Sequence, residues 1–597
     1  MKMHQALWQL IKYRPGLYTA NALAWIVILL AELGTGIVAK LFFDSMTESS
    51  AAGLTLWSII ALVVAVGIAR ILTILVGALT DIHHRYNMGS LLRRNLLSSV
   101  LARPGAQSLG RSTGEALNTF RDDSQVVEDT ISWIVDQMAF TVYAIVALGV
   151  LIAIDARITA IVVLPLLTVI AAARSVAKHI RRFREAARRA TEKVTGAIGE
   201  AMEGVQAIQL AGAEKHVLSH VQELNKARLI ATVRDRLLSQ SFHSFFWNTA
   251  TLCTGLILLA AADGLRAGTF TVGDFALFVI YVGVLAEFVA VIGDFMMHLK
   301  QGAVSMERMV ELSHDGTGSA VVAHAPIHMH GPLPEVLAPR RTASDRLETL
   351  RIDHLFFSWP KEGCTEADAE RVFALRDISF SLSRGEFVVI TGRIGSGKST
   401  LLRTLLGLLP MEHGSIAWNG RPVIDPAEFF VPPRCAYTPQ VPQLFSDTLQ
   451  SNIRMGLPST PAEIEEALFL AVMEDDVPHL QAGLDTMIGA KGVKLSGGQR
   501  QRTAAARMFI RDPELLVFDD LSSALDVETE NLLWDRTFSR GDRTALVVSH
   551  RRPALERADR IILLKDGAIE GIGALGDLMA KHEEMRSLWG SGLEAQA

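Results

Sequence analysis

Cysteine is nearly absent from this sequence. The 597 residues contain three cysteines, Cys253, Cys364 and Cys435, which lie far apart. An odd number of widely spaced cysteines argues against a disulfide framework and against a zinc site built from cysteine ligands. This content is typical of a protein that works in a reducing compartment.

The sequence also lacks a strong net charge. Lys and Arg number 58 and Asp and Glu 63, so the formal charge is only −5 at pH 7. Nothing in this balance indicates a basic surface, and we expect no nucleic-acid partner. Residues 1–14 contain no short apolar core followed by small residues, so we expect no removable signal peptide.

Long apolar runs divide the chain into two parts and predict a multi-domain membrane protein. They end near residue 300, and the remainder has the composition of a soluble α/β enzyme. Crossing a hydrocarbon core of about 30 Å takes ~20 helical residues. Six stretches are long enough, near residues 17–43, 54–79, 131–154, 158–178, 241–262 and 276–298. The sequence therefore predicts an all-α transmembrane domain of six helices over residues 1–311.

The distribution of basic residues indicates which loops are cytoplasmic. The segment 174–236 carries thirteen Lys and Arg residues and 81–130 carries six, whereas 44–53 carries none. Cytoplasmic loops are enriched in basic residues, and a soluble helical core would not produce this asymmetry. With an even number of spans, we expect both termini in the cytoplasm. The two basic segments are expected to be helices that extend beyond the membrane.

Several polar residues lie inside the predicted spans. Glu32 and Glu287 are near the middle of the first and sixth spans, and Arg70, Asp136 and Asn248 are further examples. Charges inside a bilayer are costly and are often functional. One interpretation places Glu32 or Glu287 on a substrate path, where it recognises a cation. The other is hydrogen bonding between helices, or, for Arg70, a side chain that reaches the membrane surface.

A phosphate-binding loop lies in the second part of the chain. Gly392-Arg393-Ile394-Gly395-Ser396-Gly397-Lys398-Ser399-Thr400 follows the apolar strand 386–390 and precedes the apolar helix 401–409. Its glycines let backbone N–H groups approach phosphates, and the helix N-terminus favours their negative charge. Lys398 is expected to contact the β- and γ-phosphates, and Ser399 to bind Mg²⁺. Alone, the loop indicates only that a nucleoside triphosphate binds.

A second motif, Leu495-Ser496-Gly497-Gly498-Gln499, follows about a hundred residues later. The two motifs in this order resemble the nucleotide-binding domain of the ATP-binding-cassette (ABC) transporters. The resemblance implies an α/β P-loop domain over residues 350–597 that binds ATP and Mg²⁺. It also implies that this LSGGQ signature contacts a nucleotide held by the opposite domain of a dimer.

The transmembrane part resembles the ABC exporters at four places. They are Ser112–Leu117 with Arg121-Asp122-Asp123, as the first intracellular loop; Glu200–Ile208, as the second; Gly268–Asp274, as the entry to the sixth helix; and Ser305–Arg308, as its cytoplasmic exit. The four places follow one another in the order that the family has.

The same resemblance assigns roles to residues around the phosphate loop. Asp519, at the end of the apolar run 515–519, matches the aspartate that orders the Mg²⁺ shell. Gln440 matches the glutamine that senses Mg²⁺, the attacking water and the membrane domain. His550 matches the histidine that reaches the γ-phosphate, and Asp526, in Ser523-Ala524-Leu525-Asp526, lies in the loop that couples the two sites. Trp359 takes the place of the aromatic that stacks on adenine, where the family more often has Tyr.

The residue after the Mg²⁺ aspartate departs from the family pattern. Most active members have Glu there to polarise the attacking water, and this chain has Asp520. An aspartate withdraws the carboxylate by ~1 Å, and a misplacement of this size can reduce the rate ~100-fold. Because Lys398, Ser399 and His550 are present, we expect this site to bind ATP but to hydrolyse it slowly.

Two further departures lie elsewhere in the domain. Ala490 replaces a usual Glu in the segment 486–492, which in exporters touches the intracellular loops. An acidic insertion at residues 361–370 has no role that we can derive. Residues 312–349 are rich in Gly, Pro, His and Ala without periodicity, which indicates a solvated linker rather than a metal site, despite His314, His324, His328 and His330.

Together these features predict one half of a dimeric ABC exporter in a bacterial plasma (inner) membrane, in contact with membrane lipid. The transported substrate is expected to be an amphipathic small molecule, a lipid or a peptide. Asp520 beside an intact signature favours a heterodimer with a second half-transporter, whereas a homodimer would contain two slow sites. Import of a metal chelate and an ATP-gated channel or regulator are the alternative functions.

Overall fold

The protein forms two compact units. The computed structural model describes residues 3–46, 56–106, 112–313, 316–329, 331–335, 341–359, 372–489, 492, 494–521, 525–539 and 543–594. One unit comprises Met1–Val100 with Arg111–Met329, and the other comprises Leu101–Gly110 with His330–Ala597. The proposed boundaries at residues 311 and 350 remain predictions.

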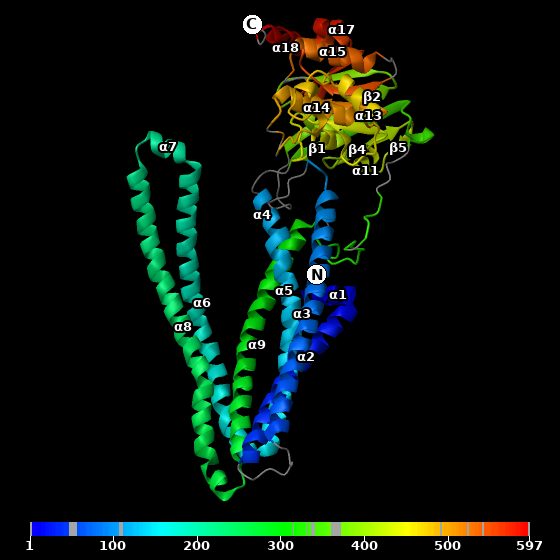
Figure 1. Ribbon diagram of the computed structural model, residues 1–597. Helices are drawn as coiled ribbons and strands as arrows, with labels where there is room; N and C mark the ends of the chain where they lie inside the picture. Colours follow the sequence, from blue (N-terminus) through cyan, green and yellow to red (C-terminus); the bar gives the residue numbers. More distant parts are fainter. Residues whose placement is uncertain are drawn as a thin grey trace. The chain divides into compact units, whose positions relative to one another are not determined.

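Among the described residues, six long helices build the first unit (Figure 1). They are α2 Pro15–Met46, α3 Leu56–Leu101, α5 Ser124–Ile154, α6 Ala156–Glu203, α8 Glu214–Ala267 and α9 Val272–Leu312. Each predicted span falls in one of them, apart from residues 54 and 55, which lie outside the described residues. The predicted fold class of six transmembrane helices followed by an α/β domain is therefore confirmed.

Four of these helical segments are long and apolar enough, among the described residues, to cross a membrane: Pro15–Met46, Trp57–Leu101, Thr113–Ile154 and Val272–Leu312. In α6 the described apolar stretch is shorter, Ala156–Pro165. The basic segments continue the helices, as expected, and the short helix α7, Val205–Leu210, joins α6 to α8 at their tip (Figure 1). Between α5 and α6, Asp155 makes the turn by accepting hydrogen bonds from the backbone N–H groups of Arg157 and Ile158.

The first intracellular loop is tied to the end of α9. Ser112 caps helix α4, Thr113–Asn118, and forms a capping box with Glu115. A π-helical turn, η1 Thr119–Asp123, then leads into α5. There Asp123 accepts a hydrogen bond from Ser305 Oγ at 2.7 Å and lies 3.5 Å from Arg308. Two of the four exporter-like segments therefore meet through a buried carboxylate.

The entry to α9 is fixed by a close backbone approach. Thr271 and Asp274 form a capping box, and Asp274 pairs with Lys40 on α2 at 2.5 Å. A Cβ on Gly273 would lie 2.4 Å from both Asp44 Oδ1 and the Lys40 carbonyl oxygen. Glycine at this position therefore lets α9 begin directly against the end of α2.

Part of the segment expected to be a solvated linker packs on the helices. Asn95 on α3 donates to the carbonyl groups of Val321 and Ala323. The ring of His324 contacts Tyr13 of the N-terminal helix α1, Met3–Tyr13, and its Nε2 lies 2.8 Å from the Gln9 carbonyl. Residues 316–325 thus belong to the first unit, although they lack regular secondary structure. His314 and His330 lie outside the described residues.

Two sheets build the second unit. The smaller has the order β2-β1-β4-β5, and the larger has the order β10-β9-β3-β8-β7-β6. In the larger sheet β9, β3, β8, β7 and β6 are parallel, and β10 is antiparallel to β9. The strands are β1 Thr349–Trp359, β2 Val372–Ser383, β3 Phe387–Thr391, β4 His413–Trp418, β5 Arg421–Pro422, β6 Cys435–Thr438, β7 Leu515–Asp519, β8 Thr544–Val548, β9 Arg560–Lys565 and β10 Ala568–Gly573.

The unit also contains helices, and the central strands β3, β7 and β8 of the larger sheet are buried along their whole length. The helices are α10 Lys398–Leu405, α11 Pro426–Phe429, α12 Leu449–Arg454, α13 Pro461–Leu470, α14 Gly497–Phe509, α15 Val527–Phe538, α16 Arg552–Arg557, α17 Leu575–Lys581 and α18 Glu583–Glu594, with 3₁₀ turns η2 Ala343–Asp345, η3 Val477–His479 and η4 Gly483–Asp485. The segment Leu101–Gly110 also belongs to this unit, and within it Ala106 donates a backbone hydrogen bond to the Leu408 carbonyl at 3.0 Å.

Candidate nucleotide site

Four parallel strands place the predicted catalytic groups at one edge of the larger sheet. The phosphate loop follows β3, His550 follows β8, Asp519 ends β7, and Gln440 follows β6. These strands are neighbours in the order β3-β8-β7-β6. Because the carboxyl ends of parallel strands lie at the same edge, residues far apart in the sequence converge there.

The phosphate loop has a backbone conformation that requires glycine at defined positions. Gly392, Gly395 and Gly397 have φ values of 148°, 86° and 99°. A Cβ on Gly392 would lie 2.2 Å from the Leu564 carbonyl oxygen, and one on Gly397 would lie 2.8 Å from that of Ala374. Ser396 Oγ is buried, and no described group forms a hydrogen bond with it. The backbone of the loop and the Ser396 hydroxyl are therefore positioned to bind phosphate oxygens.

Lys398 is the first residue of helix α10, and its side chain turns back into the phosphate loop. Its ammonium group donates to the carbonyl oxygens of Gly392 and Arg393, each at 2.7 Å. Burial lowers the pKa of Lys398, and the carboxylates of Asp520 and Asp519 oppose this effect. The amine is thus positioned at the N-terminus of α10 beside two acidic groups. Thr400 lies in the first turn of the same helix.

Ser399 and Asp519 form the group that fits Mg²⁺. Ser399 Oγ donates to Asp519 Oδ1 at 2.8 Å, and Tyr437 donates its hydroxyl to Asp519 Oδ2 at 3.2 Å. Burial and the nearby Asp519 carboxylate raise the pKa of Tyr437 to about 12, so this phenol keeps its proton. A hydroxyl beside a carboxylate is the donor set that Mg²⁺ takes in ATPases.

Asp520 is held by Gln440 and lies near His550. Gln440 Nε2 donates to Asp520 Oδ2 at 3.2 Å, and His550 Nδ1 lies 3.8 Å from Asp520 Oδ1. Burial raises the pKa of Asp520, while His550 and Gln440 act in the opposite direction. The three residues proposed as catalytic therefore form one cluster.

The LSGGQ segment forms the N-terminus of helix α14. Ser496 is the N-cap and forms a capping box with Gln499. Gln499 Nε2 also donates to Asp476, which pairs with Arg502 at 2.5 Å. Leu495 is buried, and Gly497 and Gly498 make the first turn of the helix. A helix N-terminus held in this way attracts anions.

Some predicted residues lie away from this cluster or outside the described residues. Trp359 ends β1 and is 42% exposed, with its ring edge-on to Phe357. Asp526 caps α15 by accepting from the N–H and hydroxyl groups of Thr529, both at 2.8 Å. Ser523, Ala524, Ala490 and the insertion 361–370 lie outside the described residues.

Sequence reasoning missed three residues of the site. Tyr437 stands three residues before Gln440, so its strand position was the available signal. Asp476 orients Gln499 from a turn between α13 and η3, and nothing in the sequence marks it. The third is Glu584 on α18, a buried carboxylate that pairs with Arg393 of the phosphate loop.

Two segments of the chain match known protein families. Residues 20–287 match the family described as the ABC transporter transmembrane region, and residues 375–523 match the family described as ABC transporter. The chain belongs to the ABC transporters. It is a half-transporter of the exporter type, and its nucleotide-binding domain is an ATPase that is coupled to transport.

Known relatives cover most of this ABC transporter. It is 29% identical over 520 residues to the probable multidrug resistance ABC transporter ATP-binding/permease protein YheI of Bacillus subtilis, with 83% of this chain and 81% of that one covered. It is 29% identical over 506 residues to the ATP-dependent lipid A-core flippase of Bordetella avium, with 82% and 79% covered. The structure of a bacterial Atm1-family ABC exporter with ATP bound has the same fold, with a TM-score of 0.68, 21% identity and 96% and 98% coverage.

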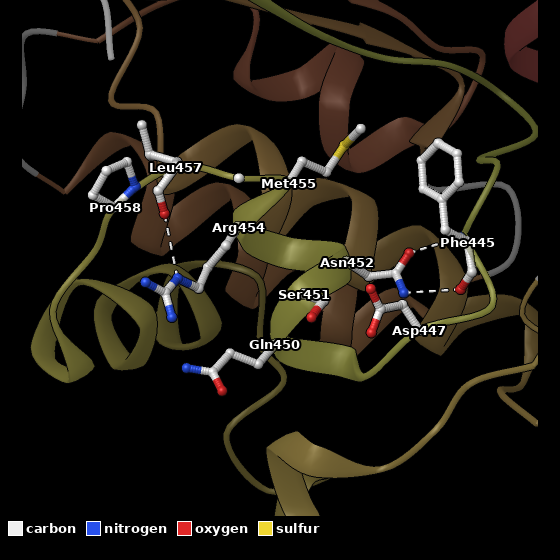
Figure 2. Close-up of a pocket in the computed structure, with 10 residues that line it drawn as sticks. Phe445, Asp447, Gln450, Ser451, Asn452, Arg454, Met455, Leu457 and Pro458 are labelled. Carbon is white, nitrogen blue, oxygen red and sulfur yellow. Dashed lines mark hydrogen bonds between the residues drawn. The ribbon is translucent and has the colours of Figure 1, made fainter. Parts of the chain in front are cut away.

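A separate hollow lies beside helix α12 and contains none of the phosphate-loop residues. Its cavity of about 620 Å³ is lined by residues 445, 447, 450–452 and 454–458 (Figure 2). Asn452 exchanges two hydrogen bonds with the backbone of Phe445, at 2.8 and 3.0 Å, and so fixes one wall. Phe445 is 57% exposed and Met455 45% exposed, so this 445–458 hollow offers two accessible apolar side chains beside its polar ones.

Proposed function

We propose that this ABC transporter exports an amphipathic small molecule, a lipid or a peptide as one half of a dimer, and that its own ATP site hydrolyses slowly. We place it in a bacterial plasma membrane with both termini in the cytoplasm. The relatives named for multidrug resistance and for lipid A-core flipping support export.

The position of Asp520 is the observation that supports slow ATP hydrolysis at this chain's own site. It follows Asp519 directly, at the end of β7, and its carboxylate is bound by Gln440. The aspartate side chain is shorter than glutamate by one methylene, and a ~1 Å withdrawal from an attacking water can reduce the rate ~100-fold. General bases contribute ~10²–10⁴-fold, so the loss falls within what this residue can supply.

ATP binding does not depend on Asp520. The left-handed glycines of the loop, the Lys398 ammonium and the N-terminus of α10 supply the phosphate ligands. Ser399, Asp519 and Gln440 would hold Mg²⁺, which neutralises charge between the β- and γ-phosphates. Trp359 would stack on adenine, and His550 would reach the γ-phosphate. The site therefore retains nucleotide while turnover is slow.

The signature serves the partner's nucleotide in this proposal. Ser496 and Gln499 stabilise the N-terminus of α14, and Asp476 holds Gln499 in place. An N-terminus of this kind can contact phosphates of ATP bound to a second subunit. Asp526 would connect the two sites. Because the signature is intact while Asp520 departs from the pattern, we propose a heterodimer whose second half carries Glu at the matching position.

The long helices offer a surface for that partner. The tip formed by α6, α7 and α8 exposes Leu210 (91%) and Met202 (74%). Exposed apolar side chains at a helix tip favour docking into a groove. We propose that the tip of one subunit enters the 445–458 hollow of the other. Gln440 lies five residues before Phe445, so docking at this place would move Gln440 and Asp520 together.

Export and partnership are tested together in reconstituted vesicles. The chain is purified alone and with a co-expressed half-transporter that has Glu after its Mg²⁺ aspartate. ATP-dependent accumulation of a fluorescent amphiphile inside inverted vesicles is expected only for the pair. Accumulation by the lone chain at the same rate per ATPase domain would contradict the heterodimer. Movement in the opposite direction, or ATP-gated flux without accumulation, would contradict export.

A further inference from the structure

Two of the charged residues inside the predicted spans pair with each other. Glu32 lies on α2 and Arg70 on α3, and Arg70 donates a hydrogen bond to Glu32 Oε2 at 2.7 Å. The interpretation of Arg70 as a side chain that reaches the membrane surface is therefore not supported. Both side chains remain about one-third exposed.

A third charge approaches this pair from α9. Glu287 is exposed on its helix and interacts electrostatically with both Glu32 and Arg70. None of the basic residues that the structure describes forms an ion pair with Glu287. The three side chains therefore carry two carboxylates for one guanidinium.

Tyr143 on α5 adds a polar group that lacks a partner. Its side chain is 1% exposed, and no described residue forms a hydrogen bond with its hydroxyl. The hydroxyl interacts electrostatically with Glu32, Arg70 and Glu287. By contrast, the neighbouring Tyr281 on α9 is satisfied by the Leu33 carbonyl at 2.8 Å. Because buried hydroxyl groups in native structures are almost always paired, an ordered water or a ligand is expected to complete this one.

The depth of the three charges makes their imbalance costly without a ligand. Glu32 is near the middle of α2, and Glu287 is near the middle of the predicted span 276–298. Ionisable side chains at this depth almost always face a bundle interior or a water-filled cavity, and they pair with an opposite charge. Arg70 is already bound to Glu32, so Glu287 needs a cation from outside the chain.

We propose that Glu32, Arg70, Glu287 and Tyr143 form a membrane-embedded site that recognises lipophilic cations as transported substrates, with Glu287 as the charge partner of the ligand. Tyr143 supplies the hydroxyl, and the partly buried ring of Phe140, 6.2 Å from that of Tyr143, supplies a face on which a cation is favourable. The inference rests on the proposed export function and names the substrate class.

A pair of probes with the same shape and opposite charge tests this site. Tetraphenylphosphonium and tetraphenylborate are titrated against the nucleotide-free full-length chain in nanodiscs, with empty nanodiscs as background. The wild type is expected to bind the phosphonium at least tenfold more tightly, about 1.4 kcal/mol. Equal affinity for the two ions would overturn the proposal without any variant.

Substitutions then locate the charge partner. Glu287→Gln is expected to weaken phosphonium binding about tenfold and to leave borate binding within about twofold. Asp263→Asn removes an exposed carboxylate of the same unit, outside the predicted spans, and is expected to change neither. Unchanged phosphonium binding in Glu287→Gln would contradict the site. If that variant does not fold, Glu32→Gln replaces it, because Arg70 then neutralises Glu287 and phosphonium binding must fall.

The binding assay separates this proposal from the proposed function. It uses no ATP and no flux, so phosphonium selectivity without vesicle accumulation would contradict export and leave the site standing. Accumulation of amphiphiles without phosphonium selectivity would contradict the proposed site and leave export standing.

Discussion

Gln440 donates a hydrogen bond to Asp520 at 3.2 Å, so the residue that follows Asp519 is bound to a neighbouring protein group. The other carboxylate oxygen is buried and has no hydrogen-bond partner among the described residues, and it lies 3.8 Å from His550. This arrangement positions a short carboxylate at the edge of the site while the phosphate ligands remain in place. It is the structural basis for our proposal that this subunit binds ATP but hydrolyses it slowly.

Asp520→Asn is expected to raise thermal stability at neutral pH. Burial raises the pKa of Asp520 above its ordinary value of 3.8, so the folded protein disfavours the charged form. Stability is then lost as pH rises through the window between the ordinary and the raised pKa. The gain from Asn should therefore shrink as pH falls into this window. Thermal unfolding of the nucleotide-free chain between pH 8 and 4.5 measures it.

Asp526→Ala is the control, because its effect on thermal stability is expected to have the opposite sign. Hydrogen bonds from Thr529 lower the pKa of Asp526, so its contribution to stability is present at neutral pH and is lost on acidification. This variant should be less stable than wild type at pH 7, by the ~1 kcal/mol typical of a lost helix cap, and the deficit should diminish at low pH. A gain for Asp520→Asn that does not depend on pH would contradict the electrostatic explanation.

Ser399→Ala is expected to weaken ATP binding only when Mg²⁺ is present. The hydroxyl lies 2.8 Å from Asp519 Oδ1, so its removal takes one ligand from the metal shell and leaves the Lys398 contacts intact. We expect a loss of about tenfold, ~1.4 kcal/mol, in Mg²⁺ and no loss in EDTA. Equilibrium binding of a fluorescent ATP analogue under the two conditions checks this. Equal losses in both conditions would place Ser399 outside the metal shell.

Ser496→Ala is expected to slow ATP hydrolysis at the partner's site. Nucleotide binding at this chain's own phosphate loop is expected to be unchanged. The substitution removes the N-cap of α14, which costs ~1 kcal/mol and loosens the signature. In the mixed dimer, single-turnover hydrolysis at the partner's site should fall about tenfold. Photolabelling of this chain by an azido-ATP should remain at the wild-type level. The reverse result would mean that the signature acts within its own subunit.

Gly273→Ala is expected to destabilise the transmembrane unit by about 1–3 kcal/mol, since a Cβ there must displace backbone. Its nearest neighbours would be the Lys40 carbonyl oxygen and Asp44 Oδ1, both at 2.4 Å. Gly283→Ala on the same helix is the matched control, because nothing lies within 4 Å of a Cβ at that position. Thermal unfolding of the full chain in detergent should separate the two variants, and equal melting temperatures would contradict the close approach.

The sequence was most informative where chemistry depends on local order. Asp519 ends a strand, and the phosphate loop, Gln440 and His550 each follow one, so a parallel sheet brings them together whatever the details of packing. The six long helices were also predictable, because apolar length and basic flanks are properties of composition. The capping box of Ser496 and Gln499 likewise has a local signature.

Contacts between helices could not be predicted in this way. Asp123 meets Ser305 and Arg308 across 182 and 185 positions, and Arg70 meets Glu32 on another helix. Such pairings depend on the rotation and relative shift of long helices, which apolar periodicity leaves open. Asp476 and Glu584 are similar cases, because each reaches the site from a segment without a motif.

The steady-state ATP turnover of the purified chain, measured alone and as Asp520→Glu, tests the central claim most directly. We expect slow turnover with retained nucleotide for the wild type, and an increase of about 100-fold for Asp520→Glu, because the longer side chain removes the ~1 Å withdrawal of the carboxylate. Lys398→Ala serves as the blank, since it removes the phosphate-loop ammonium. Ordinary turnover by the wild-type chain, unchanged by Asp520→Glu, would contradict the account.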